Sequence, residues 1–169
     1  MKTAGIILAV TVALTLQTTL ARFLERGEVA VDLVLVVVVY VALTSGPVTG
    51  LMTGALAGLM QDALSSGVVG IGGLAKTLIG FLAGIIGTQF IVSQPLPRFV
   101  VFFAATLLHA VVFIGLYTLL DLRHFGSPYA ATLGQAAGNA AVGVIAFQLA
   151  ELLPGAVERR RASRSRVRR

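Results

Sequence analysis

The stretch from Gly46 to Gly87 constrains the fold of this chain more than any other. Its first half carries glycines four residues apart, and a carboxylate continues the row: Gly46, Gly50, Gly54, Gly58 and Asp62. In an α-helix this spacing places every member on one face. The second half repeats the spacing, in the order Lys76, Gly80, Gly84 and Thr88. Two helices with small-residue faces and one opposite charge each are predicted to pack together.

The composition identifies the solvent in which these helices pack. Hydrophobic residues make up 57% of the 169 residues and charged residues only 12%, whereas soluble domains are about 25% charged. We therefore predict an integral membrane protein. The chain has no cysteine and two histidines, which excludes disulfides, thiol catalysis and a Cys/His metal cluster. No cofactor and no metal are expected.

Six apolar segments follow one another, separated by turns rich in charge, Gly or Pro. We expect helices over residues 3–21, 29–44, 47–64, 71–92, 99–120 and 129–153. The valine run of the second segment would suit a strand in a soluble protein, but an open sheet edge cannot be satisfied in lipid. The first segment is expected to be a retained anchor and not a cleaved signal peptide, because Lys2 alone is a thin positive region.

The predicted fold class is thus an all-α integral membrane protein with six transmembrane helices in one compact bundle. Residues 1–153 form this domain, and residues 154–169 form an Arg-rich cytoplasmic tail. The net charge of +6 lies in that tail, because residues 158–169 carry seven Arg and one Glu. An even number of crossings places both termini on one side, and the tail assigns that side to the cytoplasm.

The tail also predicts partners at the membrane surface. Each cation near an anionic leaflet contributes on the order of 1 kcal/mol. We therefore expect anionic lipids of the inner leaflet to contact Arg159, Arg160, Arg161 and Arg164. No aromatic residue interleaves these arginines, so nucleic acid is not an expected partner.

This topology brings three charges to one level in the outer leaflet. Asp32 stands near the start of the second helix, Asp62 near the end of the third, and Lys76 inside the fourth. We predict a polar cluster of the three, since charges within a membrane are costly and need partners or water. Two interpretations stay open: a functional site, or Asp62 and Lys76 that pair with each other or reach water. His109 is expected to hydrogen-bond between helices and not to be a ligand.

Small and hydroxylated residues predict further helix contacts. Close packing is expected at Gly80 and Gly84, and again at Gly134 and Gly138 in the sixth helix. Four threonines share one face of the first helix, and they either face other helices or bond their own backbone carbonyls: Thr11, Thr15, Thr18 and Thr19.

An enzyme is not expected. Catalysis needs acids, bases or metal ligands that converge. The membrane segments offer mainly Asp62, Lys76, His109 and Glu151, which are spread over four helices.

Two stretches resemble the MreD family of rod shape-determining membrane proteins. VDLVLVVVVYVAL, residues 31–43, has the family's Asp-Leu, apolar run and Tyr. GALAGLMQDALSSGVVGIGGLAKTLIGFLAG, residues 54–84, has Gly-x-x-x-Gly-x-x-x-Asp, then Ser/Gly and a Gly-led helix. The family-like positions are Gln17, Asp32, Tyr40, Gly54, Gly58, Asp62, Gly67, Gly70, Lys76 and Gly80. Two departures are Val31, where the family commonly has Pro, and the long Arg tail.

The resemblance implies a non-enzymatic subunit of the cell-elongation machinery in the bacterial inner membrane. Its expected partners are an MreC-like single-span protein, a RodA-type glycosyltransferase with its transpeptidase, and MreB. Through them it would support peptidoglycan synthesis and cell shape. On this interpretation the MreC membrane helix docks on Gly50, Gly54, Gly58 and Asp62, although the same glycines could equally pack the protein's own bundle.

The resemblance also implies a fold similar to the substrate-binding component of energy-coupling-factor transporters. This gives an alternative function, in which the chain binds a small molecule such as a vitamin for a transporter of that type. The loops show no obvious cluster of Trp, Tyr and Asn that would read such a ligand.

Overall fold

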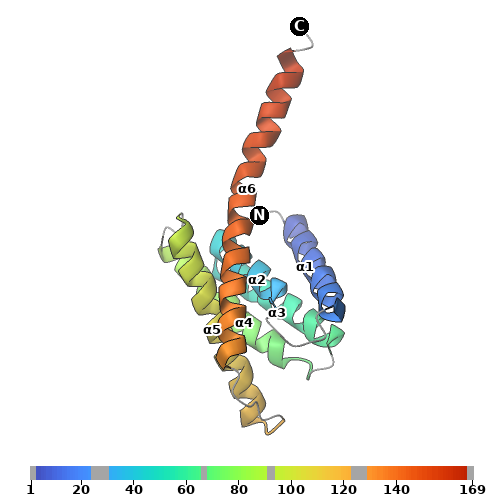
Figure 1. Cartoon of the computed structure of the whole chain (residues 1–169), viewed down its shortest axis with the longest axis vertical. Helices are drawn as coiled ribbons and strands as arrows, with labels where there is room; N and C mark the ends of the chain where they lie inside the picture. Colours follow the sequence, from blue (N-terminus) through green and yellow to red (C-terminus); the bar gives the residue numbers. More distant parts are fainter. Residues whose placement is uncertain (1–2, 24–30, 66–67, 91–93, 123–128, 167–169) are drawn as a thin grey trace.

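A computed structural model describes residues 3–23, 31–65, 68–90, 94–122 and 129–166. Helices joined by turns are the only regular secondary structure in this part. Six helices follow one another in this part (Figure 1). They are α1 (Thr3–Phe23), α2 (Leu33–Ser45), α3 (Pro47–Leu64), α4 (Ile71–Gln89), α5 (Pro95–Leu119) and α6 (Tyr129–Arg166).

Three of these helices are long and apolar enough to cross a membrane: α4, α5 and the part of α6 that ends at Leu152. Two others are apolar but shorter, namely the Thr3–Thr19 part of α1 and the whole of α2. The all-helical fold class is confirmed. Six complete crossings stay a prediction.

Helix α2 lies at the centre of the bundle. It contacts α1, α3, α4, α5 and α6, and seven of its thirteen residues are buried. Its valines pack into two apolar cores. Val39 lies in one with Phe102 and Phe147, and Val38 lies in the other with Leu14. A helix that is apolar on every side suits such a central place.

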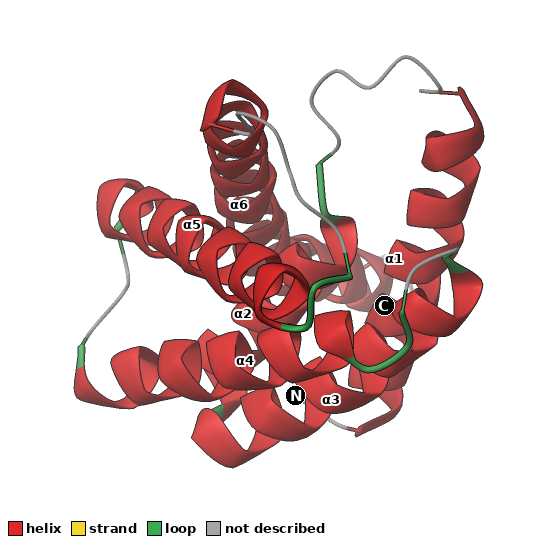
Figure 2. Cartoon of the chain, turned by 90° about the horizontal axis from the view of Figure 1, so that it is seen from below, coloured by secondary structure: helices red, strands yellow, loops and turns green. Residues whose placement is uncertain are grey.

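The other helices are arranged around α2 as pairs. The most extensive contact joins α3 to α4, and the next joins α5 to α6. Figure 2 shows α3 and α4 lying side by side, with α5 across from α4. In Figure 1, α6 continues as one long helix beyond the bundle toward the C-terminus.

Three helix ends differ from the sequence prediction by four residues or more. Helix α2 begins only at Leu33, because Asp32 acts as its N-cap. Helix α5 begins at Pro95. Proline is tolerated at a helix start because the N–H that it lacks would have no partner within the helix there. The backbone of α6 remains helical to Arg166 and so crosses the predicted domain boundary between residues 153 and 154.

Candidate functional site

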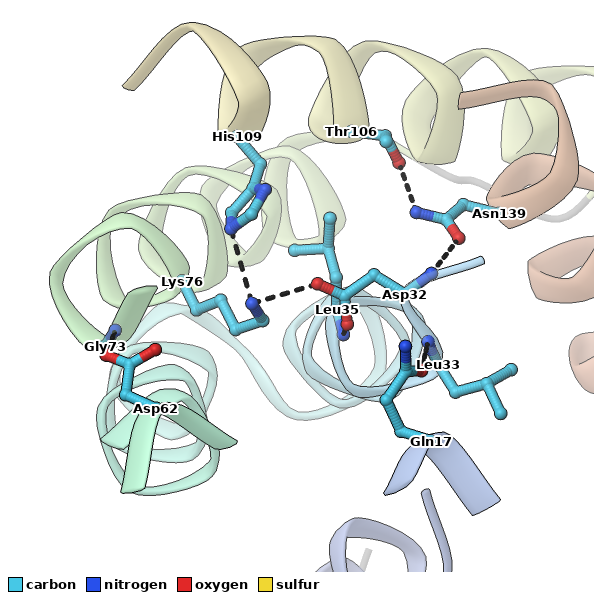
Figure 3. A network of polar contacts seen from close by, with 10 residues as sticks. All are labelled: Gln17, Asp32, Leu33, Leu35, Asp62, Gly73, Lys76, Thr106, His109 and Asn139. Carbon is cyan, nitrogen blue, oxygen red and sulfur yellow. Dashed lines mark hydrogen bonds and ion pairs between the residues drawn. The ribbon is translucent and has the colours of Figure 1, made fainter. Parts of the chain in front are cut away.

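The start of α2 lies in a buried network of polar side chains (Figure 3). Asp32 accepts a hydrogen bond from the backbone N–H of Leu35 at 2.9 Å with one oxygen. Its other oxygen is 2.9 Å from Nζ of Lys76 on α4, and both side chains are almost fully buried. Because a buried charge without a partner is strongly destabilising, each of the two compensates for the other.

His109 of α5 joins this ion pair. Its Nε2 lies 3.4 Å from Nζ of Lys76, and Figure 3 shows the lysine between the histidine and Asp32. An ammonium group can only donate, so Nε2 accepts and the ring proton belongs on Nδ1. His109 therefore has the interhelical position expected from the sequence.

Side chains from α1 and α6 bind the first backbone N–H groups of α2. The fully buried Asn139 accepts from the N–H of Asp32 at 2.9 Å and donates to Thr106 at 3.1 Å. Gln17 accepts from the N–H of Leu33 at 2.8 Å. A helix start leaves such donors without partners inside the helix, so these contacts fix the position of α2 relative to three other helices.

Asp62 has a different role from the one expected. Its Oδ2 accepts from the N–H groups of Gly70 at 2.8 Å and Gly73 at 3.0 Å, at the start of α4. A carboxylate is favourable there because the N-terminus of a helix carries partial positive charge. Of the alternatives left open by the sequence, the pairing of Asp62 with Lys76 is not the one that forms, since the ion pair of Lys76 is with Asp32.

Both carboxylates nevertheless line one cavity of about 320 Å³. Six of its polar lining residues are Asp32, Gln61, Asp62, Lys76, His109 and Gln135. Within the described structure, Oε1 of Gln61 is buried and has no hydrogen-bond partner. Asp62, Lys76 and His109 lie on separate helices, as the sequence predicts, but the fold brings all three to this one cavity.

An aromatic column forms one wall of this region. The rings of His109 and Phe113 stack with centroids 5.8 Å apart, and those of Phe113 and Tyr117 lie 4.8 Å apart. The hydroxyl of Tyr117 accepts from the N–H of Val68 at 3.1 Å. This bond ties α5 to the connection between α3 and α4.

The glycine row of α3 faces α4. A methyl group at Gly54 would overlap the backbone of Lys76, and one at Gly50 would overlap the carbonyl of Gly80. The same holds for Gly58 against Gly73 and for Gly84 against Pro47. Gly138 packs beside Val31, and Gly134 is half-buried. Internal packing thus accounts for the contacts of the glycine row, while docking of a partner through it stays a prediction.

The threonine face of α1 is settled by its hydrogen bonds. All four hydroxyls donate to backbone carbonyls of the preceding turn, so the interpretation that they bond their own helix is confirmed: Thr11, Thr15, Thr18 and Thr19.

A second charged cluster, which the sequence prediction missed, joins the first turn of α5 to Glu151 inside α6. Arg98 is buried, pairs with Glu151, and has its guanidinium 4.4 Å from the centroid of the Phe147 ring. Tyr40 packs on the same ring at 4.5 Å. Pro95 could have indicated this cluster, because proline is favoured at the first position of a helix. A helix that begins at Pro95 contains Arg98 in its first turn.

Some predicted residues lie outside what the structure describes. Gly67 is among them, as are the side chains of Arg159, Arg160, Arg161 and Arg164, although the backbone there belongs to α6. Among the described residues, no group of three or more His, Cys, Asp or Glu could hold a metal ion.

The comparisons with known proteins agree with the resemblance seen in the sequence. The family model described as rod shape-determining protein MreD matches residues 2–148, nearly the whole chain. No curated protein and no solved structure matched the chain. The similarity to energy-coupling-factor components therefore stays a prediction.

Proposed function

Because the chain belongs to the MreD family of rod shape-determining proteins and thus has a role in rod-shape determination, we propose that it is a non-enzymatic subunit of the bacterial cell-elongation complex. It acts by binding an MreC-like single-span protein and so supports peptidoglycan synthesis by the RodA-type glycosyltransferase and its transpeptidase. MreB is the further partner on the cytoplasmic side. The observation that carries this proposal is the family match over residues 2–148.

The proposal includes a topology in the inner membrane. All six helices cross, both termini lie in the cytoplasm, and the buried polar network lies toward the outer side. The charges support this orientation, because seven Arg follow the last apolar segment and positive residues favour the cytoplasmic side. The arginines of residues 159–164 contact anionic lipids of the inner leaflet.

The partner helix docks on the α3–α4 pair in this proposal. The glycines hold the two helices together, and the opposite side of α3 presents an exposed apolar row with the same spacing: Val48, Met52, Leu56, Met60 and Leu64. Methionine adapts its shape to a partner surface, so this row is suited to an incoming helix. The sequence-based hypothesis of docking on Gly50, Gly54, Gly58 and Asp62 is the competing geometry, in which the partner would have to displace α4.

The connection between α3 and α4 then meets the part of the partner that follows its membrane helix. Asp62 supports this connection through the N–H of Gly70, and Tyr117 supports it through Val68. A segment held from two sides is a defined surface for a partner.

Co-purification and cell shape test the proposal together. A tagged copy should replace the native protein in the bacterium that carries it, restore rods, and bring an MreC-like single-span protein through detergent extraction. Loss of the protein should give round cells. Rods that persist without it, or an inserted copy that restores rods with no such partner, would contradict the proposed function.

A further inference from the structure

The contact between α4 and α5 leaves an apolar hollow of about 230 Å³. Side chains from both helices line it, among them Ile79, Ala83, Ile86, Val101, Ala105 and Leu108. In a membrane such a hollow is filled by an apolar group, because neither water nor a polar ligand finds partners there. The two helices that line it are both long and apolar enough to cross a membrane.

The polar cavity continues the same line along α4 and α5. Lys76 precedes Ile79 by one helical turn, and His109 directly follows Leu108. Beyond these two residues the cavity is lined by Gln61 and Asp62 of α3. Along this line the chemistry changes from apolar, to cationic, to rich in hydrogen-bond acceptors.

Lys76 and Gln61, which both line the cavity, each have hydrogen-bonding capacity that the described residues leave unused. The ammonium of Lys76 has three N–H donors, and Asp32 and His109 account for two of them. Oε1 of Gln61 is a buried acceptor without a partner. Asp32 pairs with Lys76, whereas Asp62, which also lines the cavity, accepts only from backbone N–H groups at the start of α4, so among the described residues the Gln61–Asp62 end carries a carboxylate without a cationic partner.

We propose that this line is a binding site for an aminophospholipid of the leaflet on the side where α2 begins. An acyl chain occupies the hollow between α4 and α5, the phosphate accepts from Lys76, and the primary ammonium donates to Gln61 and lies near Asp62. The order of these groups in phosphatidylethanolamine is the order of the matching surfaces along the protein. This site uses none of the five residues of the docking row proposed on α3.

Native mass spectrometry in detergent tests the site with defined lipids. The full-length protein is offered phosphatidylethanolamine, phosphatidylcholine and phosphatidylglycerol with the same acyl chains. We expect phosphatidylethanolamine to be retained several-fold more than the other two, because phosphatidylcholine has no N–H donor and phosphatidylglycerol has no cation.

Two variants separate the headgroup from the acyl chain. Gln61→Leu should abolish the preference for phosphatidylethanolamine, while Gln148→Leu, at an exposed glutamine of α6, should preserve it. Ala104→Trp fills the hollow and should reduce retention of all three lipids, while Ala141→Trp, at an exposed alanine of α6, should leave it unchanged. Thermal unfolding of each variant shows whether it is folded.

Three results would overturn the proposal. The first is equal retention of the three lipids by the native sequence. The second is a preference for phosphatidylethanolamine that survives Gln61→Leu in the folded protein. The third is displacement of the lipid by free phosphoethanolamine at equal concentration, which would assign the cavity to a soluble ligand and remove the hollow from the site.

Discussion

The two faces of α3 carry the same four-residue spacing with opposite contents. The face toward α4 consists of Gly50, Gly54 and Gly58, each so close to α4 that a methyl group would overlap it. The opposite face carries Met52 and Leu56, which are 55% and 65% exposed. Glycines remove side chains where two backbones must meet, whereas large apolar residues remain where lipid or another protein is the neighbour.

This difference shows what a glycine row can and cannot reveal. It indicates that a helix approaches closely, but it does not say which helix. Here the neighbour is the next helix of the same chain, and the α3–α4 pair is therefore a closed unit. The partner proposed above docks on the other face.

The largest loss of stability is expected in the buried polar network of Asp32 and Lys76, beside the glycine face of α3. Lys76→Met leaves Asp32 buried without its partner and should cost about 4 kcal/mol of unfolding free energy. The double variant Lys76→Met with Asp32→Asn should recover most of this loss, because asparagine can still cap α2. Unfolding midpoints in detergent measure both, and a double variant as unstable as the single one would contradict the pairing.

A bulky residue in the closed face should have the next largest effect. Gly54→Leu forces side-chain atoms against the backbone of Lys76 and should cost on the order of 3 kcal/mol. The matched control is Gly115→Leu on α5, where no atom lies within 4 Å of a new Cβ. Similar midpoints for the two variants would mean that the α3–α4 contact is not closed.

The cap on α4 should contribute less. Asp62→Ala removes the acceptor for two backbone N–H groups, and we expect a loss of about 2 kcal/mol. Asp62→Asn keeps an oxygen in place and should cost less than Asp62→Ala. If the two variants unfold at the same midpoint, the hydrogen bonds of Asp62 do not hold the start of α4.

The smallest change in unfolding free energy is expected at Gln61, where a substitution should raise stability and not lower it. Gln61→Leu removes a buried acceptor without a partner, so delipidated protein should gain about 1 kcal/mol. The gain should shrink when phosphatidylethanolamine is added, because only the native side chain binds it. A loss of stability in delipidated protein would show that Gln61 has a structural partner.

The sequence was sufficient for much of the fold. Apolar segment length predicted six helices, and Pro47 correctly predicted the start of α3. The level of Asp32 and Lys76 followed from helix direction alone. These features depend on neighbours in the chain, which is why local patterns found them.

The remaining features depend on partners distant in the sequence. Asn139 binds the N–H of Asp32, 107 residues away, and no spacing rule connects the two. The predicted helices over residues 71–92 and 99–120 leave Arg98 in the turn between them, whereas α5 begins at Pro95 and includes Arg98. Lys76 faced two possible carboxylates, and only the packing of α2 against α4 selected Asp32.

Cysteine crosslinking along α3 tests the central claim most directly, since the native chain has no cysteine. Single cysteines at the exposed positions Met52, Leu56 and Met60 are compared in cells with cysteines at the buried Thr53 and Ala57, each against cysteines placed in the membrane helix of the MreC-like partner. We predict crosslinks at the three exposed positions and none at the two buried ones. Crosslinks confined to Thr53 and Ala57, in protein that is expressed and inserted, would contradict an outward docking surface on α3.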